Sequence, residues 1–276
     1  MRKLVYILLS ALTVASCRFA VLENRTGCPS LLYFQVFNAG AFENVDRVHV
    51  STYRFPDEES LGCDTTTILA LEGRSFCVNI VSADAVRGSG VLGFRHCRLD
   101  GEGRWTVPPG RDFDSLFRFS YLSYVEPECF TVPVEFVKEH SRITLQFVGG
   151  DVPEGTRFPF DVVLRSNTIG LNALTGEPVT GTFECLADEL SPGIFQCILP
   201  RQADDNLLLE LYGRPGRYAE EGLAHSFNLG AILRESGGIS WKEKNLPDVL
   251  VGIDFNEFDI QVQVTPWDYE TIEYAY

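Results

Sequence analysis

Apolar and polar residues alternate along most of the chain, which is the period expected of half-buried β-strands. In the segment 129–137 every second residue from Phe130 to Phe136 is apolar, and Pro133 lies on the other face. Because proline cannot donate a ladder hydrogen bond, Pro133 indicates an edge strand or a bulge. The same kind of pattern predicts strands at 31–37, 47–55, 76–83, 116–125, 142–148, 160–166 and 207–213, and a closing hairpin from 248–255 and 258–264.

One short segment has helical spacing instead. Leu229, Ile232 and Leu233 would share one face of a helix over 229–236, and the glycine pair 237–238 would end it. After residue 17 we expect no helix longer than about three turns.

A stretch rich in glycine and proline at 149–159 interrupts the strand patterns. We therefore expect an all-β chain with two tandem antiparallel β-sandwich domains, at 29–149 and 150–276. The 24 Gly and 14 Pro, with 20 Phe and 10 Tyr, agree with many turns between strands.

The start of the chain differs from the rest. Arg2 and Lys3 precede an uncharged run at 4–14 and the small residues Ala15 and Ser16. This order is typical of a secretory signal, and the run is too short for a spanning helix, which needs about 20 apolar residues. Val-Ala-Ser-Cys at 14–17 resembles the bacterial lipobox, so residues 1–16 are expected to be a lipoprotein signal peptide. Cys17 would then be the lipid attachment site and 17–28 a linker, although a plain signal peptide with a cysteine nearby is the alternative.

The charge of the chain limits its partners. The net charge is −15, and removal of Arg2 and Lys3 makes it −17 (−15 − 2). No run of Lys and Arg is present, so nucleic acid is not expected as a partner. An acidic body gains no attraction to anionic lipid, so attachment to a membrane would depend on the lipid alone.

Eight cysteines less Cys17 leave seven, so at least one is unpaired or pairs between chains. Cys185 and Cys197 flank a predicted hairpin turn. A turn centred on Ser191 would place them opposite each other, whereas a tight turn at 192–193 would place Cys185 opposite Pro200 and strain a bridge. Cys28 with Cys97 is a second candidate disulfide, reached by elimination.

Motifs for catalysis or metal binding are missing from the sequence. There is no Cys-x-x-Cys, His-Glu-x-x-His or Gly-x-Ser-x-Gly, so we expect no enzyme, no metal site and no cofactor. The segment GSGVLG at 88–93 matches Gly-x-Gly-x-x-Gly, but no helical pattern follows it, and we interpret it as a flexible loop.

Several segments, spread over almost the whole length, resemble the fimbrillin-associated anchor family of type V pili. They are the lipobox Cys17, Cys28-Pro29, WTVPPGRD (105–112), TVPVEFVKEHSRITLQF (131–147), the segment opening at 160, LPRQADDNLLLELYG (199–213), 227–255 and VQVTPW (262–267). Their order and spacing carry the resemblance more than any single piece.

This resemblance implies two transthyretin-like β-sandwich domains. It also implies a lipid-anchored outer-membrane protein, exposed at the cell surface, that holds a polymer of pilin subunits and helps to set its length. Subunits of such pili join by strand donation, a form of β-augmentation. The residues RFAVLE after Cys17 lack the acidic cluster that often accompanies surface export, so a periplasm-facing position stays open.

A glycan-binding surface lipoprotein of a nutrient-uptake system is the alternative function. Tandem β-sandwiches with exposed aromatic residues would suffice for it. Trp105, Trp241 and Trp267 could line a sugar site, or they could fill cores and the ends of sheets.

Overall fold

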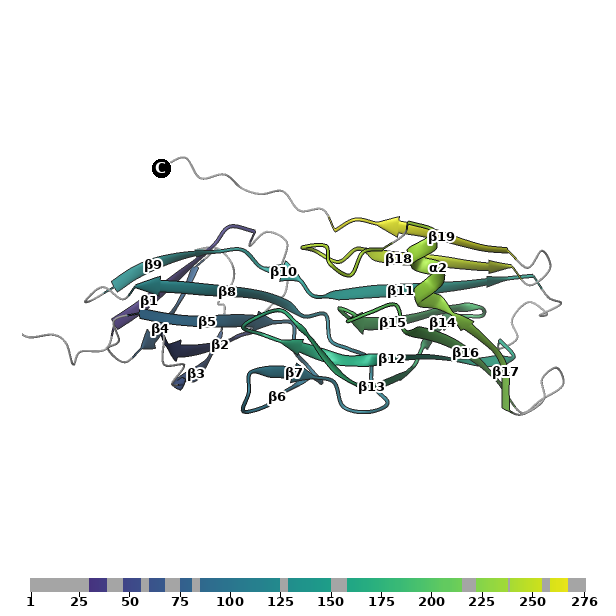
Figure 1. The fold of residues 1–276 in the computed structure, drawn as a ribbon, viewed down its shortest axis with the longest axis horizontal. Coiled ribbons are helices and arrows are strands. Elements are labelled where there is room, and N and C mark those ends of the chain that lie inside the picture. The colour runs from purple at the N-terminus through teal and green to yellow at the C-terminus, as the bar shows by residue number, and fades with distance from the viewer. Residues whose placement is uncertain are drawn as a thin grey trace, which may run out of the picture.

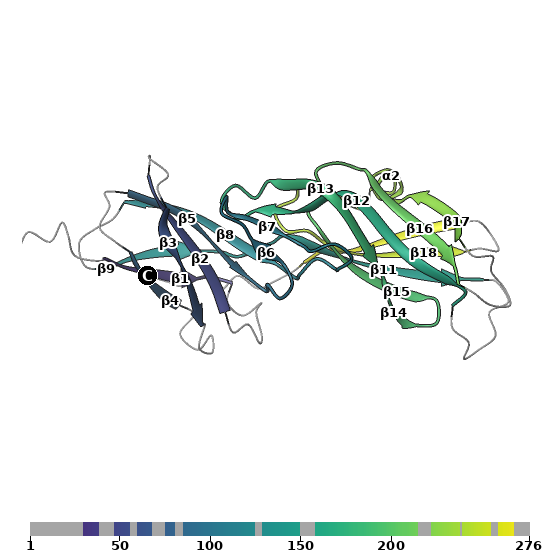
Figure 2. The ribbon, with the colours of Figure 1, turned by 90° about the horizontal axis from the view of Figure 1, so that it is seen from below.

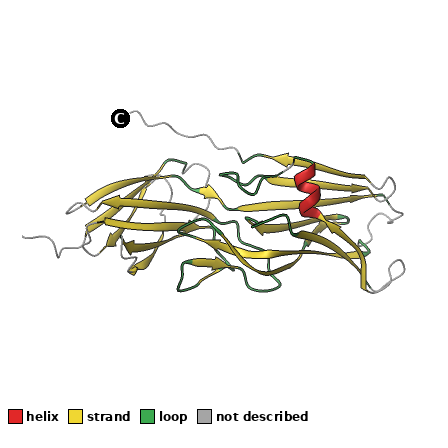
Figure 3. Ribbon diagram, viewed as in Figure 1, coloured by secondary structure: helices red, strands yellow, loops and turns green. Residues whose placement is uncertain are grey.

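The structure of the chain is a computed structural model that describes residues 30–38, 47–55, 60–67, 75–80, 85–124, 129–149, 158–214, 222–237, 239–254 and 259–267. The expected signal peptide and linker at 1–28 lie outside these ranges. Within them the chain is mostly β-strand, and the described part contains a single short helix (Figure 3). A predominantly β fold is therefore confirmed. No helix in these ranges is both long and apolar enough to cross a membrane.

The first unit lies at one end of the elongated molecule and contains two sheets (Figure 1). The three-stranded sheet has the order β4 (Ser75–Ile80), β1 (Ser30–Val36), β9 (Cys129–Val134). The five-stranded sheet has the order β10 (Val137–Lys138), β8 (Phe117–Tyr124), β5 (Ala85–Leu92), β2 (Arg47–Arg54), β3 (Ser60–Thr67). As Pro133 predicted, β9 is an edge strand of its sheet.

Alternate residues of these strands build the first core between the two sheets. Phe34 on β1 packs against Phe119 and Tyr121 on β8, with ring centroids 5.2 and 4.9 Å apart. The Tyr121 hydroxyl and the Thr52 hydroxyl are hydrogen-bonded at 2.8 Å, which satisfies both polar groups inside the sandwich.

The second unit also contains two sheets, seen from another side in Figure 2. One has the order β14 (Asp188–Ser191), β15 (Ile194–Pro200), β11 (His140–Val148), β18 (Asp248–Asp254), β19 (Asp259–Thr265). The other has the order β17 (Gly222–Asn228), β16 (Leu207–Gly213), β12 (Phe160–Asn172), β7 (Arg104–Thr106), β6 (Arg98–Leu99), and β13 (Pro178–Leu186) also pairs with β12.

The helix α2 (Leu229–Glu235) confirms the prediction from spacing. Leu229 and Leu233 point into the core of the second unit and are almost fully buried. The Asn228 side chain accepts a hydrogen bond from the N–H of Ala231 and so caps the first turn.

The pairing of the strands does not follow the boundary expected at 149–150. Segment 142–148 was expected to close the first domain, but β11 pairs with β15 and β18 of the second unit. Segment 98–106 also joins the second unit, because β7 pairs with β12. Only Glu139 separates β10 from β11, so the chain passes between the units as extended strand, without the glycine or proline that would mark a boundary.

The expectation of purely antiparallel sheets is also corrected. β1 pairs with β9 in parallel, and β11 pairs with β18 in parallel. Each parallel pair joins strands that are about 100 residues apart in the sequence, so no local turn signal could reveal it.

The segment GSGVLG is a strand and not a loop. Gly88 and Gly90 lie inside β5, between β2 and β8. A Cβ atom at Gly88 would collide with the carbonyl oxygen of Ser51, and one at Gly90 would collide with the Phe119 ring. The glycines are needed here because neighbouring groups approach the backbone closely.

Candidate functional site

The two cysteines expected near the amino terminus, Cys17 and Cys28, lie outside the described residues. Cys97, the expected partner of Cys28, is a buried free thiol. Burial raises the pKa of this thiol, and the adjacent Asp114 raises it further. Lipid attachment at Cys17 and the pairing of Cys28 with Cys97 both stay predictions.

Asp114 fixes the loop that carries the chain from β5 into the second unit. Its Oδ2 accepts hydrogen bonds from the backbone N–H groups of Arg95, His96 and Cys97 at 2.7, 2.8 and 2.7 Å. Asp114 is 4% exposed, so three amide donors replace the water that its carboxylate loses. The buried carboxylate of Asp114 therefore stabilises the conformation of this loop.

Cys185 and Cys197 do meet, but not in the way that either predicted turn required. The tight turn at 192–193 is present, since Ser191 pairs with Ile194. Cys185, however, lies on β13 in one sheet, whereas Cys197 lies on β15 in the facing sheet. The chain changes sheets at Ala187, whose N–H still donates to Val162 O at 2.8 Å. The two cysteines thus face each other across the core.

A third group that the sequence analysis did not select lies beside them. Cys185 Sγ donates to Asp112 Oδ1 at 2.7 Å, and Cys197 Sγ lies 2.7 Å from Cys185 Sγ. Both thiols are fully buried. The carboxylate oxygen of Asp112 and the two Sγ atoms lie within 4.8 Å of one another, which is close enough for all three to contact one metal ion. The spacing of residues 112, 185 and 197 in the sequence does not predict this cluster, because its members come from three separate segments.

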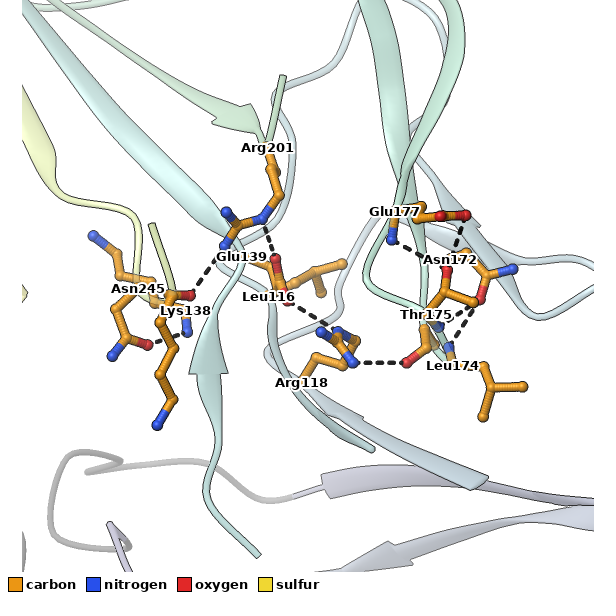
Figure 4. A network of polar contacts seen from close by, with 12 residues as sticks. Leu116, Arg118, Lys138, Glu139, Asn172, Leu174, Thr175, Glu177, Arg201 and Asn245 are labelled. Atoms are coloured by element: carbon orange, nitrogen blue, oxygen red, sulfur yellow. Dashed lines mark hydrogen bonds and ion pairs between the residues drawn. The ribbon is translucent and has the colours of Figure 1, made fainter. Parts of the chain in front are cut away.

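The second cluster joins the two units, and Figure 4 shows it from close by. Glu139, between β10 and β11, accepts hydrogen bonds from Arg118 of β8 at 2.9 Å and from Arg201 at 2.7 Å. The Glu139 side chain is 1% exposed, and those of Arg118 and Arg201 are 13% and 11% exposed. One buried carboxylate therefore holds one cation from each unit.

Backbone oxygens accept further N–H groups of both guanidinium groups. Arg201 donates to the carbonyl oxygens of Trp241, Glu243 and Lys244 at 2.6, 2.7 and 3.1 Å. Arg118 donates to the Ala173 oxygen at 3.3 Å, at the tip of the β12–β13 hairpin (Figure 4). This many partners is what a buried charge requires.

Lys138 extends the same junction. Its ammonium lies 2.6 Å from Asp248 Oδ1. Its backbone N–H donates to Asn245 Oδ1 at 2.9 Å (Figure 4). Burial lowers the pKa of Lys138, although the hydrogen bond to Asp248 opposes this shift. The sequence did contain a signal for this junction: three ionisable residues, 138–140, interrupt the alternation between Phe136 and Ile143.

The three tryptophans do not form one site. Trp105 and Trp241 are 3% and 8% exposed and belong to the core of the second unit. Trp267 packs on Phe117 of the first unit, with ring centroids 5.4 Å apart, although it follows β19 of the second. Two of the three thus fill a core, and the third connects the units.

A shallow groove of about 340 Å³ lies where the outer face of β8 meets the β12–β13 hairpin. Its lining includes Phe55, Arg87, Leu122 and Leu174. Leu122 and the nearby strand end Tyr124 are 58% and 78% exposed, so this face presents apolar surface to solvent.

Comparison with known proteins gives matches in structure but none in sequence. The sequence matches no family model and no curated protein sequence. In structure, the chain is similar to the fimbrial anchor protein Mfa2 from Porphyromonas gingivalis, with a TM-score of 0.61 and 11% identity over 87% of this chain and 98% of that chain.

Two further solved structures are similar over almost their whole lengths. A protein from Bacteroides thetaiotaomicron proposed to bind polysaccharide has a TM-score of 0.63 and 10% identity, covering 89% of this chain and 98% of that one. A proposed adhesin from Bacteroides ovatus has a TM-score of 0.56 and 14% identity, covering 90% and 96%. The chain therefore has the fold of the fimbrial anchor and adhesin proteins of these bacteria, at low sequence identity.

Proposed function

We propose that this chain is an outer-membrane lipoprotein that anchors a fimbria to the cell and takes part in its assembly or length control. The observation that carries the proposal is the agreement in fold with a fimbrial anchor over 87% of this chain and 98% of the other. The sequence segments that resemble the anchor family are spread over the same length.

The way in which the two units are joined supports a load-bearing role. A filament pulls on its anchor along the chain, so a flexible linker between the units would extend under load. Here β10 leads into β11 through Glu139 alone, and the Glu139 carboxylate binds arginines from both units. Such a junction keeps the two units in a fixed relation.

The partners that we propose are pilin subunits, and the mode of contact is strand addition. β9 and β3 are edge strands of the first unit, and β17 and β19 are edge strands of the second. A free edge presents unpaired N–H and C=O groups to which a partner strand can hydrogen-bond. We further propose that the two units correspond to the two transthyretin-like sandwich domains that the resemblance implies.

The proposed attachment to the membrane is through lipid on Cys17, with the body exposed at the cell surface. Each buried methylene contributes about 0.8 kcal/mol, and one acyl chain alone holds a protein only marginally. The several chains of a bacterial lipoprotein would hold it durably. A charge of −17 on the processed chain gives no electrostatic support on anionic lipid.

The structure gives less support to the alternative function, glycan binding. Stacking against a sugar needs exposed aromatic faces, but Trp105 and Trp241 are buried in the core of the second unit. The fimbrial anchor is therefore the function that we adopt.

The experiment is the variant Cys17→Ala, expressed in the native cell with its fimbriae. We expect no incorporation of labelled fatty acid, release of the body from the membrane fraction or retention of an uncut signal, and shedding of fimbriae into the medium. Electron microscopy of washed cells measures the last effect.

Cys28→Ala is the matched control, because Cys28 lies beyond the expected cleavage site and should not carry lipid. It should retain both the label and the fimbriae. Fatty acid on the Cys17→Ala protein would contradict the lipid site. Normal fimbriae on washed Cys17→Ala cells would leave the lipid site standing and contradict the anchoring role.

A further inference from the structure

The cluster of Asp112, Cys185 and Cys197 differs from the two buried ionic clusters at the junction, because no Lys or Arg of the described residues pairs with it. Glu139 binds two arginines, and Lys138 binds Asp248. No ion pair joins Asp112 to a basic side chain in the described part of the chain, and a second acid, Asp188, lies near enough to raise the pKa of Asp112. The structural role of the cluster must therefore come from the two thiols and the carboxylate.

The two thiols sit where a covalent bond would have a mechanical effect. Cys185 lies on β13, and among the described strands β13 pairs with β12 alone. Cys197 lies on β15, between β14 and β11 in the facing sheet. A bond between the two sulfur atoms would tie an outer strand of one sheet to an inner strand of the other.

We propose that Cys185 and Cys197 form a disulfide that locks the two sheets of the second unit together. The spacing of the cysteines alone led to a bridge within a hairpin. The structure replaces this with a bridge across the core.

The chemistry balances as a thiol–disulfide exchange. The Cys185 thiol loses its proton, and the thiolate attacks one sulfur of an oxidant disulfide, which releases that oxidant's first thiol. Cys197 then attacks the Cys185 sulfur of the mixed disulfide and releases the second. Two S–H bonds and the oxidant's S–S bond break, one protein S–S bond forms, and both protons end on the oxidant's thiols.

The burial of the cluster determines when this reaction can occur. Both cysteines are fully buried, so a protein oxidant can reach them only before β13 closes over β15. Burial raises the pKa of Cys197 well above its usual value. For Cys185 the hydrogen bond from Cys197 favours the thiolate, but burial and Asp112 outweigh it, and the pKa is again raised. A thiolate is therefore scarce in the closed core, which agrees with an exchange that takes place before closure.

The first test is peptide mapping of the full chain after export. The native protein is alkylated without reductant, digested and analysed by mass spectrometry. We expect one linked peptide containing Cys185 and Cys197, and a fall of the melting temperature on the order of 5–10 °C on reduction. Export belongs to the proposed function, so the same mapping is repeated on protein refolded in a glutathione redox buffer, whose outcome is independent of any anchoring role.

Variants distinguish the loss of the disulfide from a general loss of packing in the core. Cys185→Ala with Cys197→Ala should abolish the effect of reductant on the melting temperature, whereas Cys97→Ala, at a single buried thiol, should leave that effect intact. Both thiols alkylated in the exported and the refolded protein would overturn the proposal. So would a stoichiometric bound zinc ion with both thiols reduced.

Discussion

At the scale of single residues, His140 shows how burial sets protonation at the junction. Its imidazole is 3% exposed, its Nδ1 lies 3.0 Å from the Leu116 carbonyl oxygen, and its ring packs edge-on against Phe117. Burial is the largest cause that lowers its pKa, to about 3, and the charges of Lys138 and Arg142 add to the shift while that of Asp248 opposes it. His140 is therefore neutral in the folded protein at physiological pH.

This predicts a specific loss of stability in acid. In the unfolded chain His140 has an ordinary pKa near 6.5, so between about pH 6.5 and pH 3 the unfolded state binds the extra proton. Folding stability should therefore fall as the pH falls through this window, by about 2 kcal/mol at pH 5 from this residue alone. Urea unfolding of the protein at pH 7 and at pH 5 measures the effect.

The variant His140→Asn tests the assignment, because an asparagine amide can still donate to the Leu116 oxygen but does not titrate. Between pH 7 and pH 5, the free energy of unfolding of this variant should fall by about 2 kcal/mol less than that of the parent protein. His225, exposed on β17, is the matched control, and His225→Asn should retain the parent slope. An unchanged slope in His140→Asn would show that other groups carry the acid sensitivity.

At the scale of elements, β5 shows why a strand can contain the sequence Gly-Ser-Gly. It lies between β2 and β8, with Gly88 opposite Thr52 on one side and Tyr121 on the other. The Tyr121 ring and the Ser51 carbonyl occupy the space that a Cβ would need. The glycine thus allows a large aromatic side chain to pack over the strand.

Gly88→Ala should therefore destabilise the protein by about 1–3 kcal/mol, because the added methyl group meets backbone that cannot move away. Gly252→Ala is a matched control in mid-strand: its nearest atoms lie 3.9 Å from a Cβ, on Gln261. The Gly252→Ala substitution should lower the free energy of unfolding by less than about 0.5 kcal/mol. Thermal unfolding compares the two, and equal losses would mean that strand propensity, and not the collision, sets the cost.

At the scale of the whole molecule, the Glu139 network holds the two units in a fixed relation. Arg118 belongs to β8 of the first unit, and Arg201 follows β15 of the second. Trp267 adds an apolar contact of the same kind on Phe117. The elongated shape in Figure 1 thus has a junction that is joined by both ionic and aromatic contacts.

Glu139→Ala should lower the free energy of unfolding by about 3–5 kcal/mol, because it leaves two nearly buried guanidinium groups without their carboxylate. The control is Glu135→Ala, which breaks the pair with Lys244, whose side chains are 31% and 60% exposed. That pair should contribute less than about 1 kcal/mol. Urea unfolding measures both, and comparable losses would contradict the structural importance of the junction.

Local sequence determined several elements of this protein. The alternation at 129–137 located β9, and Pro133 placed it at an edge, because side-chain direction and the missing N–H are properties of the strand itself. The spacing at 229–236 located α2 for the same reason, since residues three and four apart share a helix face. These signals need no knowledge of any distant part of the chain.

Only the tertiary structure decided which strands pair and which side chains meet. β11 fits the pattern of either unit, and its partners β15 and β18 lie about 50 and 100 residues further along. Asp112 joins Cys185 and Cys197 only because the chain changes sheets at Ala187. Pairing depends on complementary surfaces brought together by the whole fold, whereas periodicity records only whether one face of a segment is buried.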